Sequence, residues 1–200
     1  KLFKLIIPGA IGAGVIQINL LIDIILASFL KTGSISFLYY AERINQLPIA
    51  LIGVALGTAL LPALSKHISN NEKNKAIYAQ NRAIEFSLFL ALPASIAIFI
   101  ISEPIIGAFF ERGEFSVSDK VSSANALKAF AIGIPAYVLV KILNPIFFAR
   151  QNTVTPVKIA IICVFVNFLL NLILMQFFQH VGIAMATAIS SCLNCLLLFY

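Results

Sequence analysis

Charged residues are scarce in this sequence. Asp, Glu, Lys and Arg together make up 11% of the chain, while hydrophobic residues make up 60%. An ordinary soluble domain carries about a quarter charged residues, so the scarcity excludes a chain with a charged, water-facing surface. The mean hydropathy of +1.00 leads to the same conclusion. The sequence therefore predicts a protein that lies in a membrane.

Alternation of polar and apolar residues with a period of two is weak, and the apolar runs are too long for tilted barrel strands. Helices are therefore favoured over a transmembrane barrel. Six runs approach or exceed the roughly 20 residues that a helix needs to cross the hydrocarbon. They lie near residues 5–30, 34–65, 76–101, 121–149, 156–178 and 181–200. We predict an all-α, polytopic bundle of six transmembrane spans.

Catalytic motifs are also missing. The chain has no phosphate-binding glycine loop, no HExxH, no nucleophile elbow and no serine with a plausible histidine partner. Cys192 and Cys195 have the spacing of a redox or metal pair, but no second pair accompanies them, and we interpret them as packing residues. We predict that the chain is not an enzyme and holds no resident metal or cofactor. Any transport would draw on a coupling ion or the membrane potential.

Basic residues indicate the orientation of the chain, because cytoplasmic loops gather lysine and arginine. They occur in the connections at 65–82 and 149–158, and Lys1 and Lys4 precede the first span. The connection at 102–120 is acidic instead, through Glu103, Glu111, Glu114 and Asp119. We predict that the chain enters the membrane from the cytoplasm and that residues 102–120 face outward.

Local signals mark two helix starts. Thr155 followed by Pro156 predicts an N-cap with proline in the first turn. The stretch Ser116 to Asp119 resembles a capping box, with Asp in place of the usual Glu, opening the fourth span.

Proline and glycine mark features inside the spans. Proline within a helix removes a backbone hydrogen bond and predicts kinks, here at Pro48, Pro93, Pro135 and Pro145. Gly53 and Gly57 form a GxxxG pattern, which predicts close contact between two helices.

Charged side chains deep in the spans are the strongest functional signal. Arg43 lies roughly 13 Å below the outer surface and Asp23 roughly 10 Å, at 1.5 Å per residue. A charge at such depth costs at least about 2.5–3.5 kcal/mol, so it should face a polar cavity or a partner. One interpretation is a structural ion pair in which Asp23 or Glu42 neutralises Arg43. The other is a ligand site, because the guanidinium fork binds phosphate or carboxylate oxygens in bidentate fashion.

Further polar residues accompany Arg43. Lys141 in the fourth span either extends toward the cytoplasmic interface or lines an inward-facing cavity. Asparagine in a span often joins helices through hydrogen bonds, and it occurs here at Asn19, Asn144, Asn167 and Asn171. We predict Arg43, Lys141 and Asn19 as substrate-binding residues, and Asp23 and Glu42 as counter-ion or gating residues.

Several motifs in a fixed order carry a family resemblance: "TGSIS", "YYAER" and "GVALGT", followed by "ILNPIFFARQNTVTPVKIAI". With them the chain resembles, over essentially all 200 residues, the C-terminal half of the MurJ/MviN lipid II flippases. These belong to the multidrug/oligosaccharidyl-lipid/polysaccharide exporter superfamily. The chain begins without methionine and stops within an apolar run, so we expect a fragment.

The resemblance implies a fold of two facing six-helix bundles plus two further helices, of which this chain is the second bundle. It implies transport of lipid II, an undecaprenyl-pyrophosphate-linked peptidoglycan precursor, from the cytoplasmic to the outer leaflet by alternating access. Arg43 matches the essential arginine of the family's YADR motif and would contact the anionic head group. The implied partners are lipid II, membrane lipids and the N-terminal bundle, with no nucleic acid, in the bacterial inner membrane.

Two departures from the family pattern bear on the site. Gln46 stands where many relatives carry an acid, and Asp23 stands where asparagine is more frequent. Asp23 is therefore the candidate counter-ion. Two alternatives stay open: a cation-coupled multidrug or polysaccharide-lipid exporter of the same superfamily, and a non-transporting membrane scaffold whose charges form structural pairs.

Overall fold

The computed structural model describes the backbone of residues 2–200 and the side chains of residues 14, 15 and 17–200. Every regular element in that part of the chain is a helix. The elements are α1 (Leu2–Ser28), α2 (Ser34–Pro48), η1 (Ile49–Val54), α3 (Ala55–Ser69), α4 (Lys73–Ile100), α5 (Ser102–Phe110), α6 (Val117–Ala149), α7 (Val154–Phe178) and α8 (His180–Phe199).

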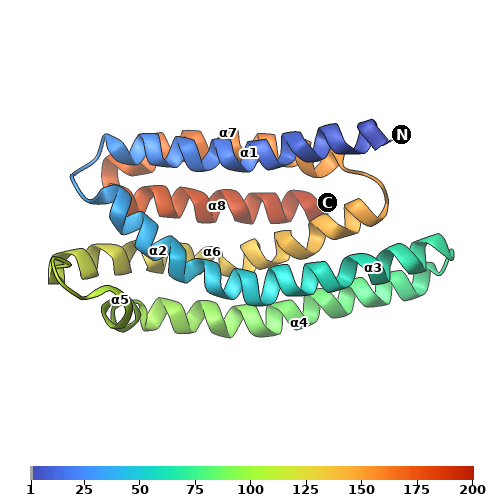
Figure 1. Cartoon of the computed structure of the whole chain (residues 1–200), viewed down its shortest axis with the longest axis horizontal. Helices are drawn as coiled ribbons and strands as arrows, with labels where there is room; N and C mark the ends of the chain where they lie inside the picture. The colour runs from blue at the N-terminus through green and yellow to red at the C-terminus, as the bar shows by residue number, and fades with distance from the viewer. Residues whose placement is uncertain (1) are drawn as a thin grey trace.

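The long helices run side by side along the molecule, with α6 at the centre (Figure 1). α6 packs against α8, α4, α2 and α3, and it is the most buried of the long helices. α1 packs mainly on α7, which in turn packs on α8. The core therefore follows the length of α6, and the other helices surround it.

The predicted spans agree with the observed helices. Five helical segments in the described residues are long and apolar enough to cross a membrane, counting Ser34–Ser69 as one continuous segment. α1 adds a sixth, because its 27 residues extend about 40 Å. The basic turn between α3 and α4 lies at the same end as the α6–α7 loop (Figure 1). This agrees with the predicted alternation, although Lys1 and the side chain of Lys4 lie outside the described residues.

The second span contains a widened turn that the sequence did not predict. Helix α2 ends at Pro48, η1 continues as a π-helix from Ile49, and α3 follows without a break. The N–H of Ala55 donates to Ala50 O, a bond that spans five residues. Proline has no N–H to donate, so the turn after Pro48 forms where the α-helical ladder has already lost a bond.

The GxxxG pattern makes the predicted close contact, and its partner is α6. A Cβ on Gly57 would lie 2.5 Å from Lys141 O, and one on Gly53 would lie 3.2 Å from Val138 Cα. Only glycine lets the backbones of η1, at Gly53, and α3, at Gly57, approach α6 this closely.

Helix starts were predicted with mixed success. The capping box is confirmed, since Ser116 Oγ accepts from Asp119 N while Asp119 Oδ2 accepts from Ser116 N. The predicted N-cap at Thr155 is wrong: α7 begins at Val154, and Thr155 N donates to Asn152 Oδ1 at 3.1 Å. The asparagine side chain accepts this N–H in place of a threonine cap.

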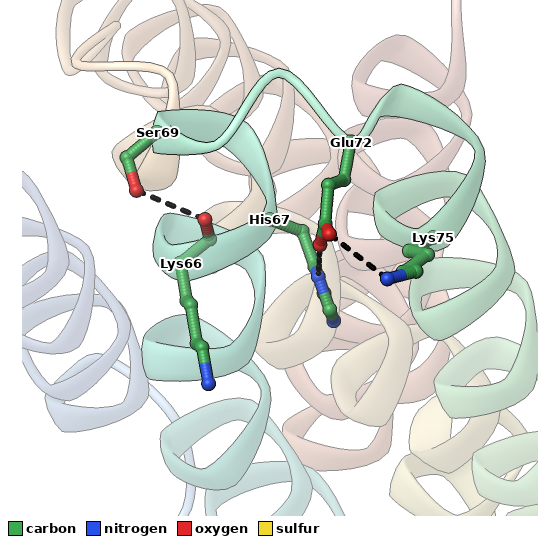
Figure 2. Close-up of polar contacts among 5 residues, drawn as sticks. All are labelled: Lys66, His67, Ser69, Glu72 and Lys75. Carbon is green, nitrogen blue, oxygen red and sulfur yellow. Dashed lines mark hydrogen bonds and ion pairs between the residues drawn. The ribbon is translucent and has the colours of Figure 1, made fainter.

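Two connections contain more structure than the sequence indicated. The acidic connection between α4 and α6 includes α5, a nine-residue helix. The turn between α3 and α4 is held by Glu72, whose carboxylate meets His67 Nδ1 at 2.7 Å and Lys75 Nζ at 2.8 Å (Figure 2). These contacts join the end of α3 to the first turn of α4.

Candidate functional site

Arg43 is exposed on α2, and neutral groups hold its guanidinium. Nη2 donates to Tyr39 Oη at 2.7 Å, and Nη1 donates to Gln46 Oε1 at 3.4 Å. The Tyr39 ring lies below the guanidinium, with Cζ 4.4 Å from the ring centroid. Helical spacing explains both contacts, because residues three and four positions apart share a face.

Of the two interpretations left open for Arg43, the structural ion pair with Asp23 or Glu42 is not formed. None of the ion pairs within the described residues includes Arg43. Glu42 instead accepts from Gln46 Nε2 at 3.1 Å. The Gln46 amide therefore bridges Glu42 and Arg43, and the positive charge of Arg43 remains without a carboxylate partner there.

Asp23 belongs to a different cluster, between α1, α7 and α8. Its carboxylate accepts from Asn171 Nδ2 at 2.6 Å and from Thr187 Oγ1 at 3.3 Å. Asn171 and Asn167 are buried and bonded to each other at 2.9 Å. The asparagines thus join helices as predicted, while Thr187 was missed because nothing in its apolar run marks it.

Asn19 lies beside the same cluster, one helical turn before Asp23. If the Asn167 amide is turned over, Asn167 gives up the bond that it accepts from Asn171, and its nitrogen comes within 3.1 Å of Asn19 Oδ1 and 3.2 Å of Asp23 Oδ1. The structure therefore groups Asn19 with Asp23 rather than with Arg43.

Lys141 is exposed on α6, at the place where Gly53 and Gly57 pack closely against this helix, which we call the glycine crossing. Its stem lies close to Gly53, where an added Cβ would be 3.2 Å from Lys141 Cβ. Gly53 follows Arg43 by ten residues on the same span, which corresponds to about 15 Å along a helix. Arg43 and Lys141, the two predicted cations, therefore lie on neighbouring helices and are separated along the helix axis.

The arrangement offers two kinds of chemistry. Arg43 and Lys141 are cations that can bind an anionic group. The Asp23 cluster brings one carboxylate together with amide and hydroxyl groups, and hard cations prefer oxygen ligands. No group of three or more His, Cys, Asp or Glu side chains that could hold a metal occurs among the residues whose side chains are described.

Comparison with known proteins gives a consistent result. The family model described as "Lipid II flippase MurJ" matches residues 1–200. A relative from Rickettsia prowazekii, named probable lipid II flippase MurJ, is 44% identical over 192 residues, or 96% of this chain and 38% of the relative. The chain thus spans well under half the length of this relative.

Solved structures share the fold. A structure of lipid II flippase MurJ in an inward closed conformation has a TM-score of 0.84 and 34% identity, covering 92% of this chain and 39% of that one. An outward-facing multidrug resistance MATE family transporter has a TM-score of 0.87, covering 99% of this chain and 43% of that one, but its 20% identity shows the fold alone. The chain belongs to the lipid II flippase MurJ family.

Proposed function

We propose that the full-length protein transports lipid II from the cytoplasmic to the outer leaflet by alternating access, and that this chain forms the C-terminal of its two bundles. The observation that carries the proposal is the state of Arg43. Its guanidinium lies exposed within a membrane span and is held by two neutral acceptors. A charge kept at such a position without a carboxylate partner suits an anionic ligand.

The roles follow from the two clusters. Arg43 binds the pyrophosphate of lipid II, and Lys141 provides a second cation about 15 Å farther along the helix axis. Asp23 and Asn19, with Asn167, Asn171 and Thr187, form the place where a coupling cation would bind; the membrane potential is the other source of energy. Glu42 acts as a gating residue through Gln46. The partners are lipid II, the membrane lipids and the N-terminal bundle.

The test measures how much lipid II is accessible from outside in cells that depend on the full-length protein. We expect Arg43→Ala to abolish this accessibility at a membrane level equal to wild type. Arg43→Lys should also fail, because an ammonium keeps the charge but cannot offer a bidentate fork.

Arg82→Ala is the matched control, because Arg82 is also on a span but pairs with Glu85 at 3.0 Å. We expect it to keep normal accessibility. Normal flipping by Arg43→Ala would show that the head group does not bind there.

A further inference from the structure

Tyr39 holds the Arg43 guanidinium in two ways at once. Its hydroxyl accepts from Nη2 at 2.7 Å, which fixes one edge of the fork. Its ring lies under the charge, with Cζ 4.4 Å from the centroid, which covers one face. A guanidinium has five N–H donors, and only two of those on Arg43 are bonded to described side chains. The remaining donors are therefore presented in a fixed orientation.

A second arginine in the chain has the same local pattern with a different outcome. Arg82 donates to Tyr78 four residues earlier at 3.2 Å, and to Glu85 three residues later at 3.0 Å. Its Cζ lies 5.5 Å from the Tyr78 ring. Arg82 therefore has a carboxylate partner at the position where Arg43 has the amide of Gln46. The tyrosine contact is shared, but only at Arg43 does it orient a charge that lacks a carboxylate partner.

We propose that Tyr39 is a positioning residue, which holds the Arg43 fork ready for a pyrophosphate oxyanion and so sets the affinity for the head group. The inference rests on the proposed function. A side chain with four rotatable bonds loses conformational freedom when it binds, and a fork that is already oriented loses less. Loss of the tyrosine hydroxyl should therefore weaken binding without removing the charge.

The experiment is a double-mutant cycle on the full-length protein in lipid nanodiscs, with lipid II as the probe and its Kd measured by native mass spectrometry. We expect Tyr39→Phe to raise the Kd about tenfold, the effect of one hydrogen bond to a charged group. In an Arg43→Lys background the same change should add little, because Lys has no fork to orient. A purely structural role of Tyr39 would not depend on residue 43 in this way.

Tyr78→Phe is the control and should leave the Kd unchanged. The inference is wrong, and the proposed function stands, if Arg43→Ala loses binding while Tyr39→Phe binds lipid II as tightly as wild type. The same holds if Tyr39→Phe raises the Kd by the same factor in the Arg43→Lys background as in the wild-type background. If Arg43→Ala binds lipid II as tightly as wild type, the head-group contact itself is wrong, and the positioning role of Tyr39 falls with it.

Discussion

At the scale of single residues, the membrane charges are separated by neutral amides. Gln46 lies between Glu42 and Arg43, and Asn171 bonds to Asp23. An amide can donate on one side and accept on the other, so it satisfies an acid and a base without neutralising either. The charges thus have hydrogen-bond partners that do not neutralise them, and Arg43 keeps further N–H donors.

Helical spacing alone indicates Tyr39 and Gln46 as partners of Arg43, because they lie four and three positions away. They were missed because only an acid of the chain and an anionic ligand were weighed as partners of this charge. The contacts of Asp23 join residues more than 140 positions apart, for example Asn171, and no local pattern indicates them.

Glu72 outside the membrane leads to a prediction about pH. Hydrogen bonds from Lys75 and His67 lower the pKa of its carboxyl below the ordinary value of 4.5. Because the folded pKa is lowered, the stabilising contribution is complete above 4.5 and is lost as pH falls through the folded pKa. We expect hydrogen exchange of the turn at residues 70–73 to speed up in that acidic range.

Glu72→Gln should show the faster exchange already at pH 7 and should lose the acid transition. Glu85→Gln, within α4 and away from the turn, serves as the control. An unchanged acid transition in Glu72→Gln would mean that another group holds the turn.

At the scale of elements, run length and proline predicted where helices lie but not how they pack. The six apolar runs were sufficient to predict the spans. α5 was missed because nine residues, "SEPIIGAFF", are too few to show a helical period beside an acidic loop. The π-helix was missed because Pro48 indicates a break in the ladder, while packing on α6 decides its form.

The glycine crossing gives a prediction about stability. Gly57→Ala would place a Cβ 2.5 Å from Lys141 O, a backbone atom that cannot rotate away. We expect a cost of about 1–3 kcal/mol, typical of overpacking, seen as a lower unfolding temperature of the full-length protein. Gly14→Ala is the matched control, since nothing lies within 4 Å of its added Cβ. Equal unfolding temperatures for the two variants would contradict the close approach.

At the scale of the whole molecule, this is a multi-pass protein of the bacterial inner membrane. Its connections separate into a basic end, with the α3–α4 turn, and an acidic end, with α5 and the loop before α6 (Figure 1). The sequence predicted this separation because charges in short connections govern insertion, and the rule requires no knowledge of packing.

Orientation can be tested by labelling with a membrane-impermeant maleimide in intact cells. We expect Gly113→Cys, in the loop after α5, to react from outside, and Asn71→Cys, in the α3–α4 turn, to react only after the membrane is opened. Wild-type protein measures the background from Cys163, Cys192 and Cys195. The opposite order of reactivity would reverse the predicted topology.

The π-helix has a consequence for the direction in which Arg43 points. A π-turn holds about one residue more than an α-turn, so the helical face before it lies about 100° from where an uninterrupted α-helix of the same number of residues would place it. Gly53 and Gly57 pack against α6 and so fix the orientation of the later part of the span. If residues 49–54 were α-helical with no residue removed and the glycines kept their place, Tyr39 and Arg43 would be turned by more than a quarter of a circle about the helix axis. A deletion of one residue between Ile49 and Val54 that restored α-helical geometry would cancel this rotation, so the direction of this charge depends on the one extra residue and the wide turn together.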